Sequence, residues 1–426
     1  MEIHVVQKGD TLWQLSRRYG VSINDIAGAN QLADLNLLII GQSLVIPTPM
    51  QYHIVQPGES LWAIANRYGI SLQELVDANR ISSPSLIYPG QRLVIPRKRK
   101  PTIEANAYIE ITGPAGAQIV NQVGEYLTYL SPFSYRAKAD GTMVPFNDTE
   151  LLQATRSNRD APLMTITNFG EGGFNSELAH AILADTQIQN QLIGNLLNVM
   201  KSKGYFGLNI DFEYVLPGDR NLYNQFIERV AGRLHQEGYS VSSALAPKLS
   251  DEQKGLLYEA HDYAFHGRVL DFVVLMTYEW GWSGGPPMAV APINQVRKVL
   301  DFAVTQIPRN KIMMGMPLYG YDWTLPYVAG GKWAPTISPQ EALRRAMIHR
   351  VSIQYDPVAQ SPFFYYVDAQ GQNHVVWFED ARSVQVKFDT VKQYNLRGVS
   401  YWVLGNPFPQ NWLLLADNFQ IKKYVG

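Results

Sequence analysis

The spacing of hydrophobic and polar positions divides the chain into two different patterns. Residues 4–47 and 53–96 each carry two short amphipathic stretches between two short apolar runs, and they align without a gap, with nineteen of 44 paired positions identical. In the first copy this pattern predicts a strand at 4–7, helices over 12–19 and 23–29, and a closing strand that ends at a proline. The chain therefore opens with a βααβ module present twice, with Thr11 and Ser60 as N-caps of the first helix in each copy.

Further along, apolar runs alternate with helical segments, and each run ends in polar or aromatic residues. The runs are 125–135, 161–169, 207–215, 240–248, 270–280, 311–323 and 398–405. This alternation predicts an α/β fold with a parallel sheet, either doubly wound or closed into a (β/α)8 barrel. Polar strand ends are typical of the catalytic face of a barrel, and no glycine-rich phosphate loop follows any run, which weakens the doubly wound, nucleotide-binding alternative.

These patterns predict domain boundaries. We expect modules at 1–48 and 52–97, a linker at 98–104 and a barrel over 105–426. The charged stretch RKRKP at 97–101 is interpreted as a solvated linker rather than a binding patch. A helix and short strands interrupt the alternation over about 333–377, which predicts a small α+β insertion between the last two barrel strands.

Composition excludes several classes of function. The net charge is −1, so no field of one sign would attract nucleic acid or an anionic membrane. The chain has no cysteine, and no apolar stretch approaches the length of a membrane helix. The first residues, MEIHVVQKGDTLW, lack a charged segment followed by an apolar one, so we expect no signal peptide. We expect a monomer without a cofactor.

The segment GLNIDFE at 207–213 carries the candidate chemistry. Alternate side chains of a strand share a face, so Asn209, Asp211 and Glu213 point together into the barrel. Two enclosed carboxylates cannot both ionise cheaply, and the pKa of one of them must rise, which makes that group a proton donor. Glu213 is nearest the strand's carboxyl end and is the natural general acid. A solvent-facing edge strand is one alternative. A metal site is another, but no HxH or HxxxH stands nearby, so we expect no metal.

The paired segments HVVQKGDTLW and HIVQPGESLW, with GQSLVIP and GQRLVIP, resemble the LysM module, which binds N-acetylglucosamine in peptidoglycan and chitin. The resemblance implies one sugar groove in each module. The first would be formed by Gly9, Asp10, Thr11, Leu12, Ile39 and Ile40, and the second by Gly58, Glu59, Ser60, Leu61, Tyr88 and Pro89. The alternative is a structural repeat that binds nothing.

Residues 206–213 resemble the motif D-G-x-D-x-D-x-E of glycoside hydrolase family 18. Further matches over about 120–420 are MTYE at 276–279, GMPLYGYDW at 315–323, WFEDARSVQVK at 377–387 and SYW at 400–402. Two positions depart from the motif, because Phe206 and Asn209 stand where it has aspartates. Neither is the proton donor, but the row of carboxylates below Asp211 is shortened, which puts the pH profile in doubt.

The family resemblance implies a retaining mechanism in which the N-acetyl oxygen of the substrate attacks C1. Glu213 would protonate the leaving oxygen and later activate water, Asp211 would stabilise the oxazolinium nitrogen, and Tyr278 would donate a hydrogen bond to the acetamido group. Trp402 would form the floor of the subsite for the scissile sugar. The other substrate-binding candidates are Asn168, Asn209, Met276, Glu279 and Tyr321.

The order of two modules and a barrel resembles spore cortex-lytic N-acetylglucosaminidases of spore-forming bacteria. That resemblance implies a place in the spore cortex or coat, peptidoglycan strands as the partner and action during germination. A chitinase, a vegetative-wall hydrolase, a non-catalytic lectin and a pure scaffold remain as alternatives. The intact set of Glu213, Asp211 and Tyr278 argues against a lectin.

Overall fold

The computed structural model describes residues 1–48, 51–81, 87–96 and 100–424. Both N-terminal modules have the expected βααβ order. Module 1 consists of β1 (Glu2–Val5), α1 (Leu12–Tyr19), α2 (Ile23–Asn30) and β2 (Ser43–Ile46). Module 2 consists of β3 (Gln51–Ile54), α3 (Leu61–Tyr68), α4 (Leu72–Asn79) and β4 (Arg92–Ile95). The two strands of each module pair antiparallel, with Glu2 opposite Ile46 in the first and Gln51 opposite Ile95 in the second.

Local sequence signals set the helix ends of the modules. The side chain of Thr11 accepts a hydrogen bond from the amide of Gln14, and Ser60 accepts one from Ala63, which satisfies amides that lack a partner in the first turn. Helix α1 stops at Gly20, whose left-handed φ of 66° suits a residue without a side chain. Both predicted N-caps are confirmed.

Eight parallel strands close into a barrel. They are β5 (Thr102–Ile109), β6 (Tyr129–Pro132), β9 (Ala161–Thr167), β12 (Gly207–Asp211), β13 (Ser240–Leu245), β14 (Phe272–Leu275), β15 (Ile312–Pro317) and β21 (Gly398–Trp402). Each pairs with the next in this order, and β21 returns to pair with β5. The sheet is therefore closed, and the doubly wound alternative is wrong.

Strand β5 corrects one boundary. It begins at Thr102, inside the expected linker of 98–104 and ahead of the expected barrel start at 105. Residues 98 and 99 lie outside the described part of the chain. The strand Thr102–Ile109 was not among the predicted runs because its sequence, TIEANAYI, alternates polar and apolar residues.

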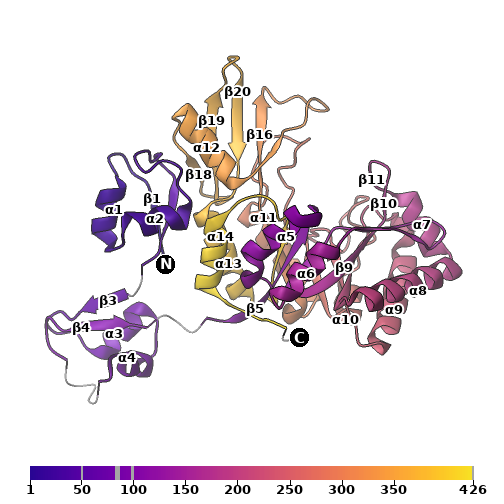
Figure 1. The fold of residues 1–426 in the computed structure, drawn as a ribbon, viewed down its shortest axis with the longest axis horizontal. Coiled ribbons are helices and arrows are strands. Elements are labelled where there is room, and N and C mark those ends of the chain that lie inside the picture. Colours follow the sequence, from indigo (N-terminus) through magenta and orange to yellow (C-terminus); the bar gives the residue numbers. More distant parts are fainter. Residues whose placement is uncertain (49–50, 82–86, 97–99, 425–426) are drawn as a thin grey trace.

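Helices surround the barrel, as Figure 1 shows. They are α5 (Gly113–Val123), α6 (Thr149–Ser157), α7 (Ser176–Ala184), α8 (Thr186–Lys203), α9 (Arg220–Gln236), α10 (Tyr263–Val269), α11 (Ile293–Gln306), α13 (Ala381–Tyr394) and α14 (Pro409–Asn418). Leu208 and Ile210 of β12 pack into the large apolar cluster that these helices share. A separate cluster, which includes Tyr108, Tyr129 and Phe272, fills the barrel interior. Apolar positions of β12 thus face the helices, as its alternation predicts.

Short elements complete the barrel domain. The short strands are β7 (Tyr135–Ala137), β8 (Met143–Val144), β10 (Phe169–Gly170), β11 (Gly173–Phe174) and β22 (Gln420–Ile421), and the 3-10 turns are η1 (Gly124–Tyr126), η2 (Pro217–Asp219) and η3 (Arg309–Lys311). Within the described ranges, no helix combines the length and the apolar character needed to cross a membrane.

The insertion is a five-stranded antiparallel sheet with one helix, standing above the barrel in Figure 1. Its elements are β16 (Gly320–Leu325), β17 (Thr336–Ile337), α12 (Pro339–His349), β18 (Gln354–Asp356), β19 (Ser361–Val367) and β20 (Asn373–Trp377). It lies between β15 and β21, the last two barrel strands, as expected. It begins at Gly320 rather than 333, because the run 311–323 contains two strands of different sheets.

Candidate active site

A cleft of about 490 Å³ opens at the carboxyl ends of the barrel strands. Both acidic and aromatic side chains line it. The full set of lining residues is Tyr108, Glu110, Phe133, Phe169, Phe174, Asp211, Glu213, Tyr214, Ala244, Pro247, Leu257, Tyr258, Met276, Tyr278, Glu279, Trp280, Trp282 and Trp402. Aromatic faces and a few carboxyl groups are the surfaces that sugars contact in binding sites.

The two carboxyl groups of β12 share this cleft. Asp211 is the last residue of the strand and is 4% exposed, and Glu213 follows it two residues later. Burial raises the pKa of the Asp211 carboxyl, to about 7. Burial, reinforced by the charges of Asp211 and Glu279, raises the pKa of Glu213 well above its ordinary value. The raised pKa favours the protonated form of Glu213, which is the form that a general acid needs.

One oxygen of Asp211 has no partner. Its Oδ1 atom is buried and makes no hydrogen bond to any described residue. An unsatisfied carboxylate oxygen inside a protein is costly, so its retention at a cleft calls for an explanation. A donor on a bound ligand, such as an amide N–H, would satisfy it.

The backbone around Glu213 is held from both sides. The side chain of Asn168, at the end of β9, accepts from the amide of Glu213 at 3.0 Å and donates to its carbonyl oxygen at 2.8 Å. On the other side, His261 Nδ1 accepts from the amide of Ala246, so Nε2 carries the proton and donates to the carbonyl of Phe212 at 3.0 Å. Burial lowers the pKa of His261 to about 4, which keeps it neutral in this role.

The segment after β14 supplies the opposite wall. Met276, Tyr278 and Glu279 all line the cleft. Tyr278 is 9% exposed, and burial raises the pKa of its hydroxyl well above the ordinary value, so it remains a hydrogen-bond donor. Glu279 accepts hydrogen bonds from the hydroxyls of Tyr319 and Tyr321, the latter at 2.8 Å.

Trp402, at the end of β21, lines the cleft. Its ring packs edge-on against Phe133, with centroids 4.8 Å apart, and lies 5.5 Å from the ring of Tyr108. These contacts hold the indole in place beside the cleft, and an aromatic face of this kind suits stacking on a sugar ring.

Residues 118–406 match the sequence model of glycosyl hydrolases family 18. The chain belongs to this family. It is therefore a glycoside hydrolase, and the carboxyl pair of β12 stands in the segment that carries the family motif. Residues 4–47 and 53–96 each match the LysM domain, so both parts of the chain indicate glycan binding.

Relatives with the same domain order match over nearly the full length. The cortical fragment-lytic enzyme of Bacillus subtilis (strain 168) is 53% identical over 427 residues, covering 99% of both chains. The crystal structure of the spore cortex-lytic enzyme SleL of Bacillus megaterium QM B1551 superposes with a TM-score of 0.89 at 43% identity, covering 99% of each chain. The SleL structure from Bacillus cereus superposes with a TM-score of 0.87 at 41% identity, covering 100% of this chain and 99% of that one.

Three of the expected substrate-binding residues do not line the family 18 cleft. Asn209 is 1% exposed and lies deeper in the barrel, where it accepts from Tyr108 Oη at 2.9 Å and donates to Ser242 Oγ at 3.0 Å. Asn168 is fully buried and acts on the backbone of Glu213. Tyr321 is 6% exposed and reaches the site through Glu279. In this structure the three residues hydrogen-bond to other groups of the site, and their contact with substrate stays a prediction.

Several cleft residues were missed. Tyr108 and Glu110 come from the unpredicted strand β5 and the residue after it. Phe169 and Phe174 face each other in the short hairpin of β10 and β11, and Phe133, Tyr214 and Tyr258 come from the loops above the barrel. The alternation in TIEANAYIE would have indicated the first two. Loop aromatics carry no periodic signal, so only the fold brings them together.

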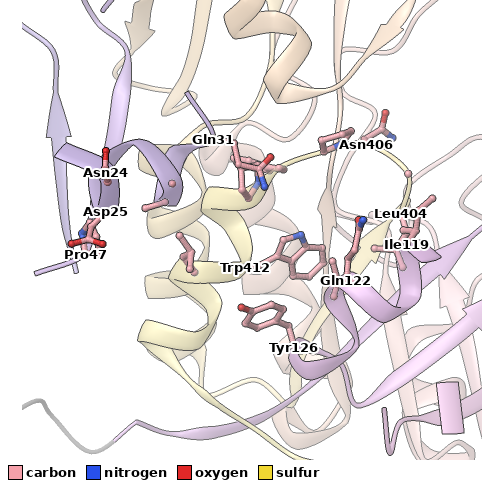
Figure 2. A pocket seen from close by; sticks show the side chains of 18 residues that line it. Asn24, Asp25, Gln31, Pro47, Ile119, Gln122, Tyr126, Leu404, Asn406 and Trp412 are labelled. Carbon is pink, nitrogen blue, oxygen red and sulfur yellow. The ribbon is translucent and has the colours of Figure 1, made fainter. Parts of the chain in front are cut away.

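A larger hollow of about 1040 Å³ lies between module 1 and the barrel (Figure 2). Helix α2, helix α5 and the segment after β21 surround it, with Gln31, Gln122, Asn406, Tyr126 and Trp412 on its walls. Asp25 is the sole carboxylate among its lining residues. The hollow has no second acid beside Asp25, so it offers no pair of groups for acid–base catalysis. In the described residues, no group of three or more His, Cys, Asp or Glu side chains could hold a metal ion.

Proposed function

We propose that this protein is an N-acetylglucosaminidase that cleaves glycan strands of the spore cortex during germination. The observation that carries the proposal is the pairing of Glu213, whose pKa is raised by burial, with an Asp211 oxygen that has no partner among the described residues. The names of the relatives, cortical fragment-lytic enzyme and spore cortex-lytic enzyme, support the substrate and the place of action.

The first step is substrate-assisted. The sugar with the N-acetyl group stacks over Trp402, and its acetamido oxygen attacks C1. The bond from C1 to the glycosidic oxygen breaks, and that oxygen takes the proton of Glu213. Asp211 Oδ1 accepts the acetamido N–H and faces the positive charge that develops on the oxazolinium ion. The Tyr278 hydroxyl donates to the acetamido group. Holding the attacking oxygen next to C1 makes the step intramolecular, so no protein nucleophile is required.

The second step reverses the role of Glu213. Its carboxylate now takes a proton from a water molecule, whose oxygen adds to C1. The C1–O bond of the oxazoline ring breaks, which regenerates the N-acetyl group with retained anomeric configuration. The hydrogen bonds of Asn168 and His261 to the backbone around Glu213 keep its carboxyl group in reach for both proton transfers. Burial, reinforced by the charges of Asp211 and Glu279, raises the pKa of Glu213, which suits it to donate a proton in the first step and to accept one in the second.

A comparison of three polymers tests the proposal. Spore cortex, vegetative peptidoglycan and chitin are incubated in parallel with the enzyme and with Glu213→Gln, and the products are identified by mass spectrometry. We expect cortex fragments whose new reducing end is N-acetylglucosamine, and none from the variant. Products that end in muramic acid would exclude an N-acetylglucosaminidase. Products from chitin alone would support the chitinase alternative.

A further inference from the structure

The two modules have matching sequences but different surroundings. Ile39 of module 1 and Tyr88 of module 2 occupy the same position of the gapless repeat, on the loop expected to line the sugar groove. Ile39 is 5% exposed and belongs to an apolar cluster with Ile337, Ala342 and Ile353 of the insertion. Tyr88 is 66% exposed. The catalytic domain therefore covers Ile39 but not the side chain of Ile40, which is 44% exposed, and the position equivalent to Ile39 in module 2 is open.

Hydrogen bonds reinforce this contact. The amide of Ile353 donates to the carbonyl of Ile40 at 2.9 Å, and the guanidinium of Arg382 donates to the carbonyl of Gly41 at 3.0 Å. On the neighbouring face of the module, Gln410 of α14 donates to Asn30 Oδ1 at 2.6 Å and to the carbonyl of Ser43 at 2.9 Å. In Figure 1 module 1 lies beside α13, α14 and the lower end of the insertion, while module 2 stands apart.

A glycine pair shows how closely module 1 is fitted. Gly41 and Gly90 are equivalent, with φ of 83° and 86°. A Cβ atom on Gly41 would lie 1.8 Å from the carbonyl oxygen of Ile353, whereas one on Gly90 would meet nothing within 4 Å. The backbone of module 1 thus approaches the insertion at a distance that only glycine permits.

We propose that the two modules have different roles: module 1 is docked onto the insertion and does not bind glycan at its groove, and module 2 alone attaches the enzyme to the polymer. This division rests on the proposed glycan substrate and adds which module contacts it. A sugar chain that contacts Ile39 would have to displace Ile353 from its side chain and break the hydrogen bond from Ile353 to the carbonyl of Ile40. None of the described residues forms such a barrier at Tyr88, whose ring is 66% exposed and suits stacking on a sugar face.

Docking also implies that module 1 stabilises the insertion. The insertion carries Tyr321, and the strand before it leads to Tyr319; both hydroxyls bind Glu279 in the cleft. The side of the insertion that contacts module 1 is formed by Ile337, Ala342 and Ile353. Module 1 therefore covers apolar surface that would otherwise face water and steadies the part of the fold that carries Tyr321, which holds Glu279 in the cleft.

The direct test uses a pentamer of β-1,4-linked N-acetylglucosamine with the full-length Glu213→Gln variant. Hydrogen exchange of backbone amides is measured with and without the sugar. We expect slower exchange at 56–61 and 87–92 of module 2, with 7–12 and 38–43 of module 1 unchanged. Protection of module 1, of both modules or of neither would overturn the division of roles. Absence of protection in the cleft at 207–214, together with no hydrolysis by the wild type, would instead count against the proposed function.

Matched variants separate docking from binding. Gly41→Ala and Gly90→Ala carry the same backbone strain, but only the first adds an atom at the docking contact. We expect amide exchange at Ile353 to accelerate at least tenfold in Gly41→Ala and to stay unchanged in Gly90→Ala. Ile39→Ala serves the same purpose if Gly41→Ala does not fold. Unchanged exchange at Ile353 in both Gly41→Ala and Ile39→Ala would overturn the docking role.

Attachment to insoluble cortex is measured by co-sedimentation. We expect Tyr88→Ala to weaken it by about 2- to 10-fold, the range for one aromatic contact, and Ile39→Ala to leave it unchanged. Equal losses in the two variants would show that both grooves bind glycan.

Discussion

At the scale of single residues, the burial of Glu213 affects stability as well as catalysis. A carboxyl group whose pKa rises on folding favours the folded state at low pH. That contribution is lost as the pH rises from about 4.3, the ordinary pKa of glutamate, through the raised pKa. We expect Glu213→Gln, which cannot ionise, to have a higher free energy of unfolding than the wild type at pH 7, by at least about 1 kcal/mol. The gain should vanish at pH 4. Urea unfolding at both pH values checks this, and an equal gain at both would contradict it.

The same substitution should remove nearly all hydrolysis. Loss of the proton donor costs about 10²–10⁴ in rate from general acid–base catalysis alone. Turnover of a soluble cortex fragment is the measurement, and binding of that fragment should survive because the amide keeps the shape of the side chain. Turnover near that of the wild type would exclude Glu213 as the acid.

Asp211→Asn tests the second carboxyl group. The amide keeps the size of the side chain but loses the charge that would face the oxazolinium ion, so turnover should fall on the order of 10²-fold. The thermal midpoint should stay close to that of the wild type. If the variant unfolds instead, Asp211 is chiefly a structural group of the barrel.

Strand alternation was enough to predict which of these side chains point inward, but not how deep each lies. Asn209 shares a face with Asp211, yet it is one step further from the barrel mouth and binds Tyr108 and Ser242. Periodicity gives the side of a strand, while depth depends on where the strand ends and what fills the barrel below it. Asp211 ends β12, so of the three side chains on this face Asp211 and Glu213 reach the cleft and Asn209 does not.

At the scale of elements, the carboxyl end of β12 depends on its neighbours β9 and β13. Asn168 can serve both the amide and the carbonyl of Glu213 because its side chain has a donor and an acceptor. We expect Asn168→Leu to lower kcat by about 10²-fold, because small displacements of a catalytic group have effects of that size. KM should change little.

A matched control separates this effect from general loss of stability. Asn195 of α8 donates to the carbonyl of Gly141, and neither residue is among those that line the cleft. Asn195→Leu should lower the thermal midpoint and leave kcat near the wild-type value. Equal losses of kcat in the two variants would show that Asn168 acts only through stability.

The elements that sequence reasoning placed well are those with a local signal. Thr11 and Ser60 fixed helix starts, and continuous apolar runs marked seven of the eight barrel strands. Strand β5 was missed because its inward face is polar, with Glu104 and Asn106 on it. The insertion was placed thirteen residues late because β15 and β16 follow each other with only a short break, and no local feature says that the second leaves the barrel.

At the scale of the whole molecule, the repeat concealed a difference that only the fold reveals. Two copies with nineteen identical pairs predict two equal sugar grooves. The surface that covers Ile39 comes from residues about 300 positions later in the chain, such as Ile337 and Ile353. No pattern within the module indicates such a partner. The one hint is the pair itself, since an aliphatic residue stands in the covered copy and an aromatic one in the open copy.

Removal of residues 1–96 should therefore have two separable effects. Loss of module 2 weakens attachment to insoluble cortex, since a tethered binding site raises the local concentration of the enzyme at a surface. Loss of module 1 exposes Ile353 and its neighbours and leaves Gln410 without Asn30. Burial of one aliphatic side chain contributes about 1.5–3 kcal/mol, so the thermal midpoint should fall by several degrees.

The loss of attachment and the loss of stability are separated by temperature. Well below the thermal midpoint, the truncated protein should still cleave short soluble fragments, because every residue of the cleft belongs to the barrel. At temperatures near the midpoint the insertion should unfold first. Activity should then fall, because Tyr321 of the insertion no longer holds Glu279 in the cleft. Activity on a soluble fragment, followed against temperature, measures this, and co-sedimentation with cortex at low temperature measures attachment. Unchanged attachment would show that the barrel holds the polymer by itself. An unchanged midpoint would show that module 1 contributes no stability to the insertion, and the docking role would fall with it.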